Sequence, residues 1–158
     1  MIGVKVIFLD FDGVLNSDEY VRRFGHFGVI LNPDKMELLK QLVEETGANI
    51  VLSTSWREHW NVTEEGCDAI GDQINQIFRR HKMYIYDKVP HRTYGGKKNI
   101  QSWLQEHPDV TSYAVLDDQF LDGEGIRNHF VKISNLRGGL NEEDVRRAID
   151  ILKGENHE

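Results

Sequence analysis

Residues 4–15 read VKVIFLDFDGVL, and this stretch decides the fold class. Its first six residues are apolar except for Lys5 and rich in β-branched side chains, which is typical of a strand buried in a parallel sheet. The strand is predicted to end at Asp10, and Gly13 breaks the run shortly afterwards. In open α/β sheets ligands bind beyond the carboxyl ends of the strands, so the acidic residues here are the first candidates for a site.

The rest of the chain alternates between strand patterns and helix patterns. Further strands are predicted over residues 49–52, 84–89, 112–116 and 130–133. Helices are predicted over residues 33–46, 70–78, 99–105 and 142–152, and residues 90–96 are predicted as a loop. This alternation predicts a three-layer, Rossmann-like α/β fold, in which helices cover both faces of a parallel sheet.

Length and composition fit a single domain. The chain has 158 residues, of which 39% are hydrophobic, and a domain of this size buries enough surface to need no disulfide. We expect one domain over residues 1–153 and a frayed tail over residues 154–158. The net charge of −7 argues against general binding to nucleic acid, although a local basic groove remains open.

Cysteine use and hydropathy indicate the compartment. Cys67 is the single cysteine, which excludes an internal disulfide and fits a reducing environment. No apolar run approaches the length of a membrane span. The apolar N-terminal run leads directly into acidic residues without a cleavage site for a signal peptide. We therefore expect a soluble cytoplasmic protein with no membrane partner.

Three predicted strands end in polar clusters, which parallel strands would bring to the same edge of the sheet. The clusters are Asp10-Phe11-Asp12, Ser53-Thr54-Ser55 and Asp117-Asp118. Four carboxylates crowded at one edge repel one another, and a hard divalent cation relieves that repulsion. Oxygen ligands of this kind suit Mg²⁺, whereas the histidines show no spacing typical of zinc.

At these positions the sequence resembles the haloacid-dehalogenase-like (HAD) phosphatases. Residues 10–15 match the DxDGxL signature of that superfamily, and residues 116–118 resemble its fourth motif. The second and third motifs are short and correspond to Thr54 and to Lys97 or Lys98. The resemblance spans residues 4 to about 152. The run STSWR at residues 53–57 and VLDD at residues 115–118 are similar to HAD domains associated with Swiss-army-knife RNA repair proteins.

The resemblance implies a role for each acidic residue. Asp10 is expected to attack phosphorus and form an aspartyl-phosphate. Asp12 is expected to protonate the leaving alcohol and then to activate water, while its main-chain carbonyl faces the metal. An Asx-turn before Gly13 is the alternative for Asp12. Asp118 is expected to ligate Mg²⁺ directly and Asp117 to act through water or to position the lysine, and this assignment can be reversed.

The remaining site residues are expected to hold the phosphoryl group. Thr54 would donate to a phosphoryl oxygen, and Ser53 is the alternative if the register shifts by one residue. Lys97 is preferred over Lys98 as the lysine that neutralises the nucleophile and the transferring group. The substrate-binding candidates are Gly13, Ser55 and Arg57, and a solvated surface position is the alternative for Arg57.

The spacing between the motifs leaves room for a short flap but not for a large cap domain. An open site suits a large phosphorylated substrate, with nucleotides and nucleic-acid ends as the candidates, or a small one if another subunit supplies the lid. The expected function is Mg²⁺-dependent hydrolysis of phosphate monoesters. The alternatives are a phosphotransferase with the same intermediate and a non-catalytic module that binds a nucleotide or phosphate.

Overall fold

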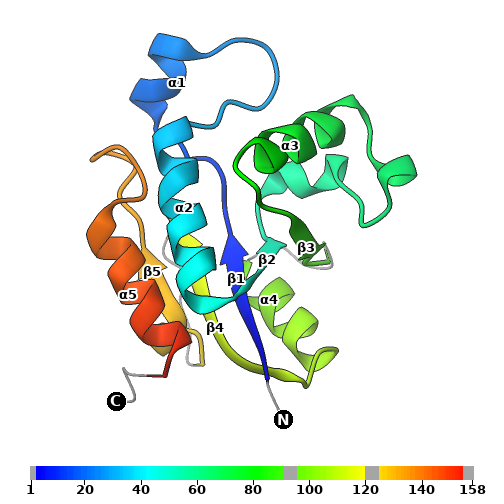
Figure 1. The fold of residues 1–158 in the computed structure, drawn as a ribbon, viewed down its shortest axis with the longest axis vertical. Coiled ribbons are helices and arrows are strands. Elements are labelled where there is room, and N and C mark those ends of the chain that lie inside the picture. Colours follow the sequence, from blue (N-terminus) through cyan, green and yellow to red (C-terminus); the bar gives the residue numbers. More distant parts are fainter. Residues whose placement is uncertain (1–2, 91–95, 120–124, 155–158) are drawn as a thin grey trace.

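The computed structural model describes residues 3–90, 96–119 and 125–154, with the side chains of residues 97 and 98 left out. It is an α/β fold built on one five-stranded sheet (Figure 1). The strands are β1 (Val4–Leu9), β2 (Asn49–Leu52), β3 (Ile85–Lys88), β4 (Val110–Asp117) and β5 (Phe130–Lys132). Their order is β3-β2-β1-β4-β5, and each neighbouring pair is parallel. The predicted fold class is confirmed.

Five α-helices and three short 3-10 helices accompany the strands within the described part of the chain. The α-helices are α1 (Asp18–Phe24), α2 (Pro33–Thr46), α3 (Ala69–Arg80), α4 (Gly96–Gln105) and α5 (Glu142–Leu152). The 3-10 helices are η1 (Ser55–His59), η2 (Glu64–Gly66) and η3 (Arg127–His129).

The boundaries of α2 show how local sequence sets an element. Asn32 caps the helix, because its side chain accepts a hydrogen bond from the Asp34 main-chain N–H, and Pro33 occupies the first turn. Gly47 ends the helix in the left-handed conformation, with φ at 70°. The sequence predicts both the start and the end of this helix.

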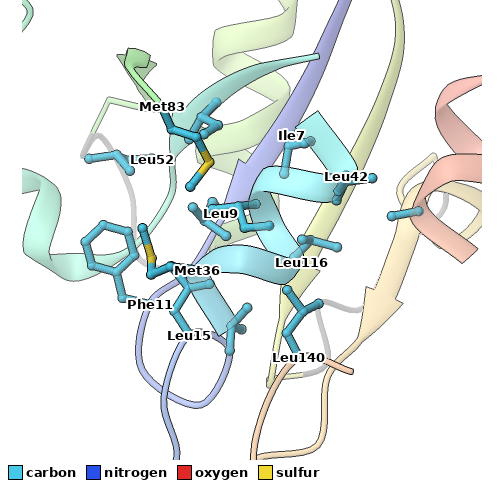
Figure 2. Packing of buried hydrophobic residues seen from close by; sticks show 14 of the residues in the cluster. Ile7, Leu9, Phe11, Leu15, Met36, Leu42, Leu52, Met83, Leu116 and Leu140 are labelled. Carbon is cyan, nitrogen blue, oxygen red and sulfur yellow. The ribbon is translucent and has the colours of Figure 1, made fainter. Parts of the chain in front are cut away.

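Alternating side chains of β1 divide the core into two layers. Ile7 and Leu9 face a large cluster that also contains buried residues of α2, α3 and α5, part of which Figure 2 shows. Val6 and Phe8 face a second cluster that includes Ile100 and Trp103 of α4. The sheet is therefore covered on both faces, as expected for parallel strands that are apolar on both sides.

Several segments differ from the sequence-based prediction. Helix α1 and the 3-10 helices η1, η2 and η3 are not predicted from the sequence, and α1 buries none of its residues. Helix α4 begins at Gly96, three residues before the predicted start and at a position predicted as loop. Strand β4 is longer than predicted and runs to Asp117.

The arrangement of the connections fixes where a ligand can bind. The chain passes from β1 to β2 on one side and from β4 to β5 on the other, so the order reverses between β1 and β4. Such a switch point is the usual place for a ligand in an open α/β sheet. Within the described residues there is no cap domain, and α1 lies beyond the carboxyl end of β1 (Figure 1). None of the described helices has the length and apolar character needed to cross a membrane.

Candidate active site

The register of β1 and β4 brings three carboxylates together. Leu9 pairs with Leu116, and the Asp10 N–H donates to the Leu116 carbonyl over 3.1 Å. Asp10 therefore follows β1 directly beside Asp117 at the end of β4. One oxygen each of Asp10, Asp117 and Asp118 lies within 4.8 Å of the other two. Of the four carboxylates predicted to meet at this edge of the sheet, those of Asp10, Asp117 and Asp118 do so.

The surroundings of Asp10 and Asp117 favour protonated carboxyls when no cation is bound. Burial, with the charge of Asp117 as the next cause, raises the pKa of Asp10 to about 8. Burial also raises the pKa of Asp117 to about 6. A hydrogen bond from the Phe11 N–H to Asp10 opposes the shift, at 2.8 Å, but does not outweigh it. Two half-buried acids, Asp10 and Asp117, whose pKa values are raised in this way form, together with Asp118, a site suited to a cation.

Gly13 lets the chain turn tightly against Asp118. Its φ is +84°, a backbone conformation that residues with a Cβ seldom adopt. A Cβ at this position would lie 2.2 Å from the Asp118 Oδ2 atom. Gly13 thus allows the turn after β1 to pass over the acidic cluster, and its predicted contact with substrate stays a prediction.

The Asp12 side chain does not join the cluster but is held by two donors. Asp12 is exposed, and the Trp56 indole Nε1–H donates to its Oδ2 atom over 3.0 Å. The amide of Asn16 donates to its Oδ1 atom over 3.2 Å. Asn16 is itself buried and also accepts from the Gly13 N–H and donates to the Ile30 carbonyl. The Asp12 carboxylate is therefore oriented by Asn16, in the turn after β1, and by Trp56, in η1.

The Thr54 hydroxyl caps η1. It is 1% exposed and accepts a hydrogen bond from the Trp56 main-chain N–H over 3.3 Å. A hydroxyl that accepts one bond still has its own proton to donate, so the predicted bond to a phosphoryl oxygen remains chemically open. The neighbouring Ser53 Oγ is buried and makes no hydrogen bond within the described part of the chain. Both registers of the second motif therefore offer a hydroxyl donor.

Arg57 lies beneath the loop that follows β2. Its side chain is 6% exposed, and its guanidinium donates to the carbonyls of Val89, Ser53 and Thr54 at 2.9–3.1 Å. These bonds explain why an arginine is buried here: they replace the water that its charge would otherwise bind. Its predicted contact with substrate stays a prediction.

Of the other site residues predicted from the sequence, the structure describes Ser55 fully but Lys97 and Lys98 only by their backbone. Ser55 is the exposed first residue of η1, directly after Thr54. Lys97 and Lys98 lie in the first turn of α4, and their side chains lie outside the described residues. The choice between the two lysines therefore stays open. The predicted frayed tail falls mainly on residues 155–158, which also lie outside the described part of the chain.

The residues present fit a magnesium ion. The three grouped side chains offer only carboxylate oxygens, the donors that Mg²⁺ prefers. A bound cation would also offset the burial, and the repulsion between carboxylates, that raise the pKa values of Asp10 and Asp117. The space that Gly13 keeps clear beside Asp118 would be filled by any larger residue.

Two residues of the site are not among the site candidates chosen from the sequence. For Trp56 the sequence favours core packing over stacking on a base; its ring packs against the core, and its indole N–H also donates to Asp12. For Asn16 the sequence leaves open whether it orients the turn or faces solvent; Asn16 is 2% exposed and organises the turn. For Asn16 the signal is its type and its place four residues after Asp12, because short amides often bond to nearby backbone groups. No local pattern connects residue 56 with residue 12.

Comparison with known proteins gives one family. A family model described as the HAD domain in Swiss Army Knife RNA repair proteins matches residues 6–145. Comparisons with curated proteins and with solved structures gave no match. The matched range contains Asp10, Asp12, Thr54, Asp117 and Asp118.

Proposed function

Because the chain belongs to the family of HAD domains in Swiss Army Knife RNA repair proteins, we propose that it is a Mg²⁺-dependent phosphomonoesterase with Asp10 as nucleophile. Family membership indicates a phosphatase-type function and a phosphorylated or nucleic-acid substrate. The observation that carries the finer proposal is the meeting of Asp10, Asp117 and Asp118 at the switch point of the sheet.

In the first half of the reaction, a carboxylate oxygen of Asp10 attacks phosphorus and forms a P–O bond. The bond between phosphorus and the ester oxygen breaks, and Asp12 gives its proton to the departing alcohol. A carboxylate nucleophile divides one difficult displacement into two easier ones. Asp12 suits the proton transfer, because it lies two residues from Asp10 and outside the acidic cluster.

In the second half, a water molecule attacks the phosphorus of the aspartyl-phosphate. Asp12, now deprotonated, accepts a proton from that water, and the bond between phosphorus and the Asp10 oxygen breaks. Inorganic phosphate leaves, and Asp10 and Asp12 return to their starting states. The same side chain thus acts as acid and then as base.

Mg²⁺ would be held by Asp10, Asp118 and Asp117, and when bound it supplies positive charge for the phosphoryl oxygens. The Thr54 hydroxyl, or that of Ser53, would donate to one of those oxygens. Lys97 or Lys98 at the start of α4 would neutralise a second negative charge.

The absence of a cap domain from the described residues supports a large substrate. An uncovered site admits a nucleotide or the phosphorylated end of a nucleic acid without a domain movement. A lid from a second subunit is the alternative for a small substrate. The family description, which names RNA repair, favours the nucleic-acid end.

Hydrolysis of an aryl phosphate and of phosphorylated oligonucleotides tests the proposal. The wild-type protein should release phosphate with Mg²⁺ and not with a chelator, and Asp10→Asn should remove the activity without changing the fold. Asp34→Asn, at an exposed position in the first turn of α2, is the matched control and should keep full activity.

Three results would redirect the proposal. Activity that survives in Asp10→Asn would exclude the assigned nucleophile. A folded, magnesium-loaded protein that is inactive on all these substrates would favour a binding module. Transfer of the phosphoryl group to an added alcohol, in preference to water, would favour a phosphotransferase.

A further inference from the structure

We propose that Trp56 is a positioning residue that holds Asp12 in the orientation for proton transfer, an inference that rests on the proposed function. Its indole Nε1 lies 3.0 Å from the Asp12 Oδ2 atom. An indole N–H can donate a hydrogen bond but cannot accept one. The contact therefore forms only when an acceptor oxygen of Asp12 points toward the Trp56 indole. Together with the Asn16 amide on Oδ1, it engages both oxygens of the carboxylate.

The exposure of Asp12 is the reason that it needs holding. An exposed side chain populates several rotamers, and only some of them point toward a leaving oxygen. General acid catalysis requires the proton donor within hydrogen-bond distance of the reacting atom. Two donors from different segments restrict the rotation of Asp12 before the substrate arrives, which lowers the entropy lost in reaching the reactive geometry.

Trp56 can perform this role because the short helix that carries it is fixed at several points. The Arg57 guanidinium donates to the Thr54 carbonyl at the start of η1. The Lys88 ammonium from β3 donates to the carbonyls of Arg57 and Trp60 over 3.1 and 2.6 Å. A helix of five residues has few bonds of its own, so these side chains supply its rigidity.

The far end of η1 is fixed to α3. The His59 ring nitrogen Nδ1 lies 2.6 Å from the Asp68 Oδ2 atom. Asp68 also caps α3 by accepting from the Gly71 N–H. A Cβ on Gly71 would lie 2.1 Å from the His59 carbonyl oxygen, so the two segments are in close contact. The ring of Trp56 also packs against the core.

The proposal predicts a dependence on the leaving group. An alkyl phosphate releases a basic alkoxide and needs the proton of Asp12, whereas 4-nitrophenyl phosphate releases a stable phenolate and needs it little. Loss of orientation should therefore slow the first substrate much more than the second. The ratio kcat/KM reports this step, because it covers the reaction up to the first departure of product.

Trp56→Phe tests this prediction, since phenylalanine keeps an aromatic ring and removes the N–H. We expect kcat/KM for a nucleoside monophosphate to fall about 10–100-fold, within the range that general acid catalysis contributes. For 4-nitrophenyl phosphate we expect a fall of less than about threefold on the same grounds. Trp60→Phe is the matched control, because it removes an indole N–H bond to the Asn75 side chain and should change neither value.

An equal loss on both substrates, or no loss on either, would overturn the proposal while leaving the assigned nucleophile intact. The indole N–H resonances give a second readout that does not depend on activity. Trp56→Phe identifies the Trp56 signal, and Asp12→Ala should shift that signal but leave the Trp60 signal in place. A Trp56 signal unchanged by Asp12→Ala would also overturn the proposal.

Discussion

At the level of single residues, Gly13 decides how closely the turn after β1 can approach the acidic cluster. Two separate constraints exclude a larger residue here. The φ of Gly13 is positive, and an added Cβ would lie only 2.2 Å from the Asp118 Oδ2 atom. Asp118 keeps its place beside Asp10 only while that space stays open. A residue without a side chain is therefore part of the proposed metal site.

Gly13→Ala should weaken Mg²⁺ binding about 10–100-fold, as expected for a change that displaces a metal ligand indirectly. Titration calorimetry measures the affinity, and phosphatase activity should fall with it. Gly138→Ala is the control, because its φ is +106° and no atom of the described residues lies within 4 Å of the added Cβ. It should suffer backbone strain alone and bind Mg²⁺ normally. Equal losses in both variants would show that strain, and not Asp118, is responsible.

The sequence predicts the site residues that end strands but not those that act across the fold. Asp10, Asp117 and Asp118 can be predicted, since parallel strands bring their carboxyl ends to one edge. The bond between Trp56 and Asp12 cannot be, because it joins positions 44 residues apart and depends on how η1 packs. The hydrogen bonds from Arg57 to main-chain carbonyls cannot be predicted either, because a carbonyl acceptor leaves no signal in the sequence.

At the level of elements, η1 connects the second motif to the first. It is capped by Thr54, braced by Lys88 from β3 and fastened to α3 through His59. Strands and long helices can be predicted because apolar side chains repeat along them. Helix η1 has no such repeat, and its conformation depends on side chains from three other segments.

Lys88→Met should loosen η1, because methionine replaces the aliphatic stem but removes two hydrogen bonds from a charged donor. We expect a loss of about 2 kcal/mol in the free energy of unfolding. This corresponds to a fall in Tm of about 4–8 °C, measured by calorimetry. Activity on nucleoside monophosphates should fall as in Trp56→Phe.

Lys132→Met serves as the control for that substitution, since Lys132 also lies on a strand but is exposed. Its Tm and activity should match those of the wild type. A Lys88→Met protein as stable and as active as the control would mean that η1 does not depend on the lysine.

At the level of the whole molecule, stability should depend on pH through the acidic cluster. Without metal, the folded protein holds protons on Asp10 and Asp117 more tightly than the unfolded chain, since their pKa values are raised to about 8 and about 6. This contribution is fully present below the unfolded pKa, near 4, and is lost as pH rises through 6 and then 8.

The Tm of the chelated protein should therefore fall between about pH 5 and about pH 8.5, and Mg²⁺ should raise it far more at the upper end of this interval than at the lower. Asp10→Asn should make the Tm of the chelated protein depend less on pH over this interval. Asp10→Asn leaves the pairs of His81 with Glu37 and of His59 with Asp68 in place, so the difference between the two proteins reports the acidic cluster. A Tm that rises over this interval in the chelated protein would refute the assigned sign.

The architecture is predictable as a class, while the order of its strands is not. Alternating patterns predict a parallel sheet but do not specify which strands are neighbours. The switch point between β1 and β4 exists only in the folded chain. There the end of β1 brings Asp10 beside Asp117 and Asp118 at the end of β4.

Titration of Mg²⁺ into the metal-free protein at about pH 8 tests the existence of this group most directly. At this pH Asp117 is ionised, and Asp10 is near its own pKa and so about half ionised. The wild type should bind one ion, and Asp118→Asn should bind it at least about tenfold more weakly, a difference of about 1.4 kcal/mol. Asp109→Asn, at an exposed position just before the other end of β4, should bind as the wild type does. Equal affinities for Asp118→Asn and the wild type would contradict the proposed site.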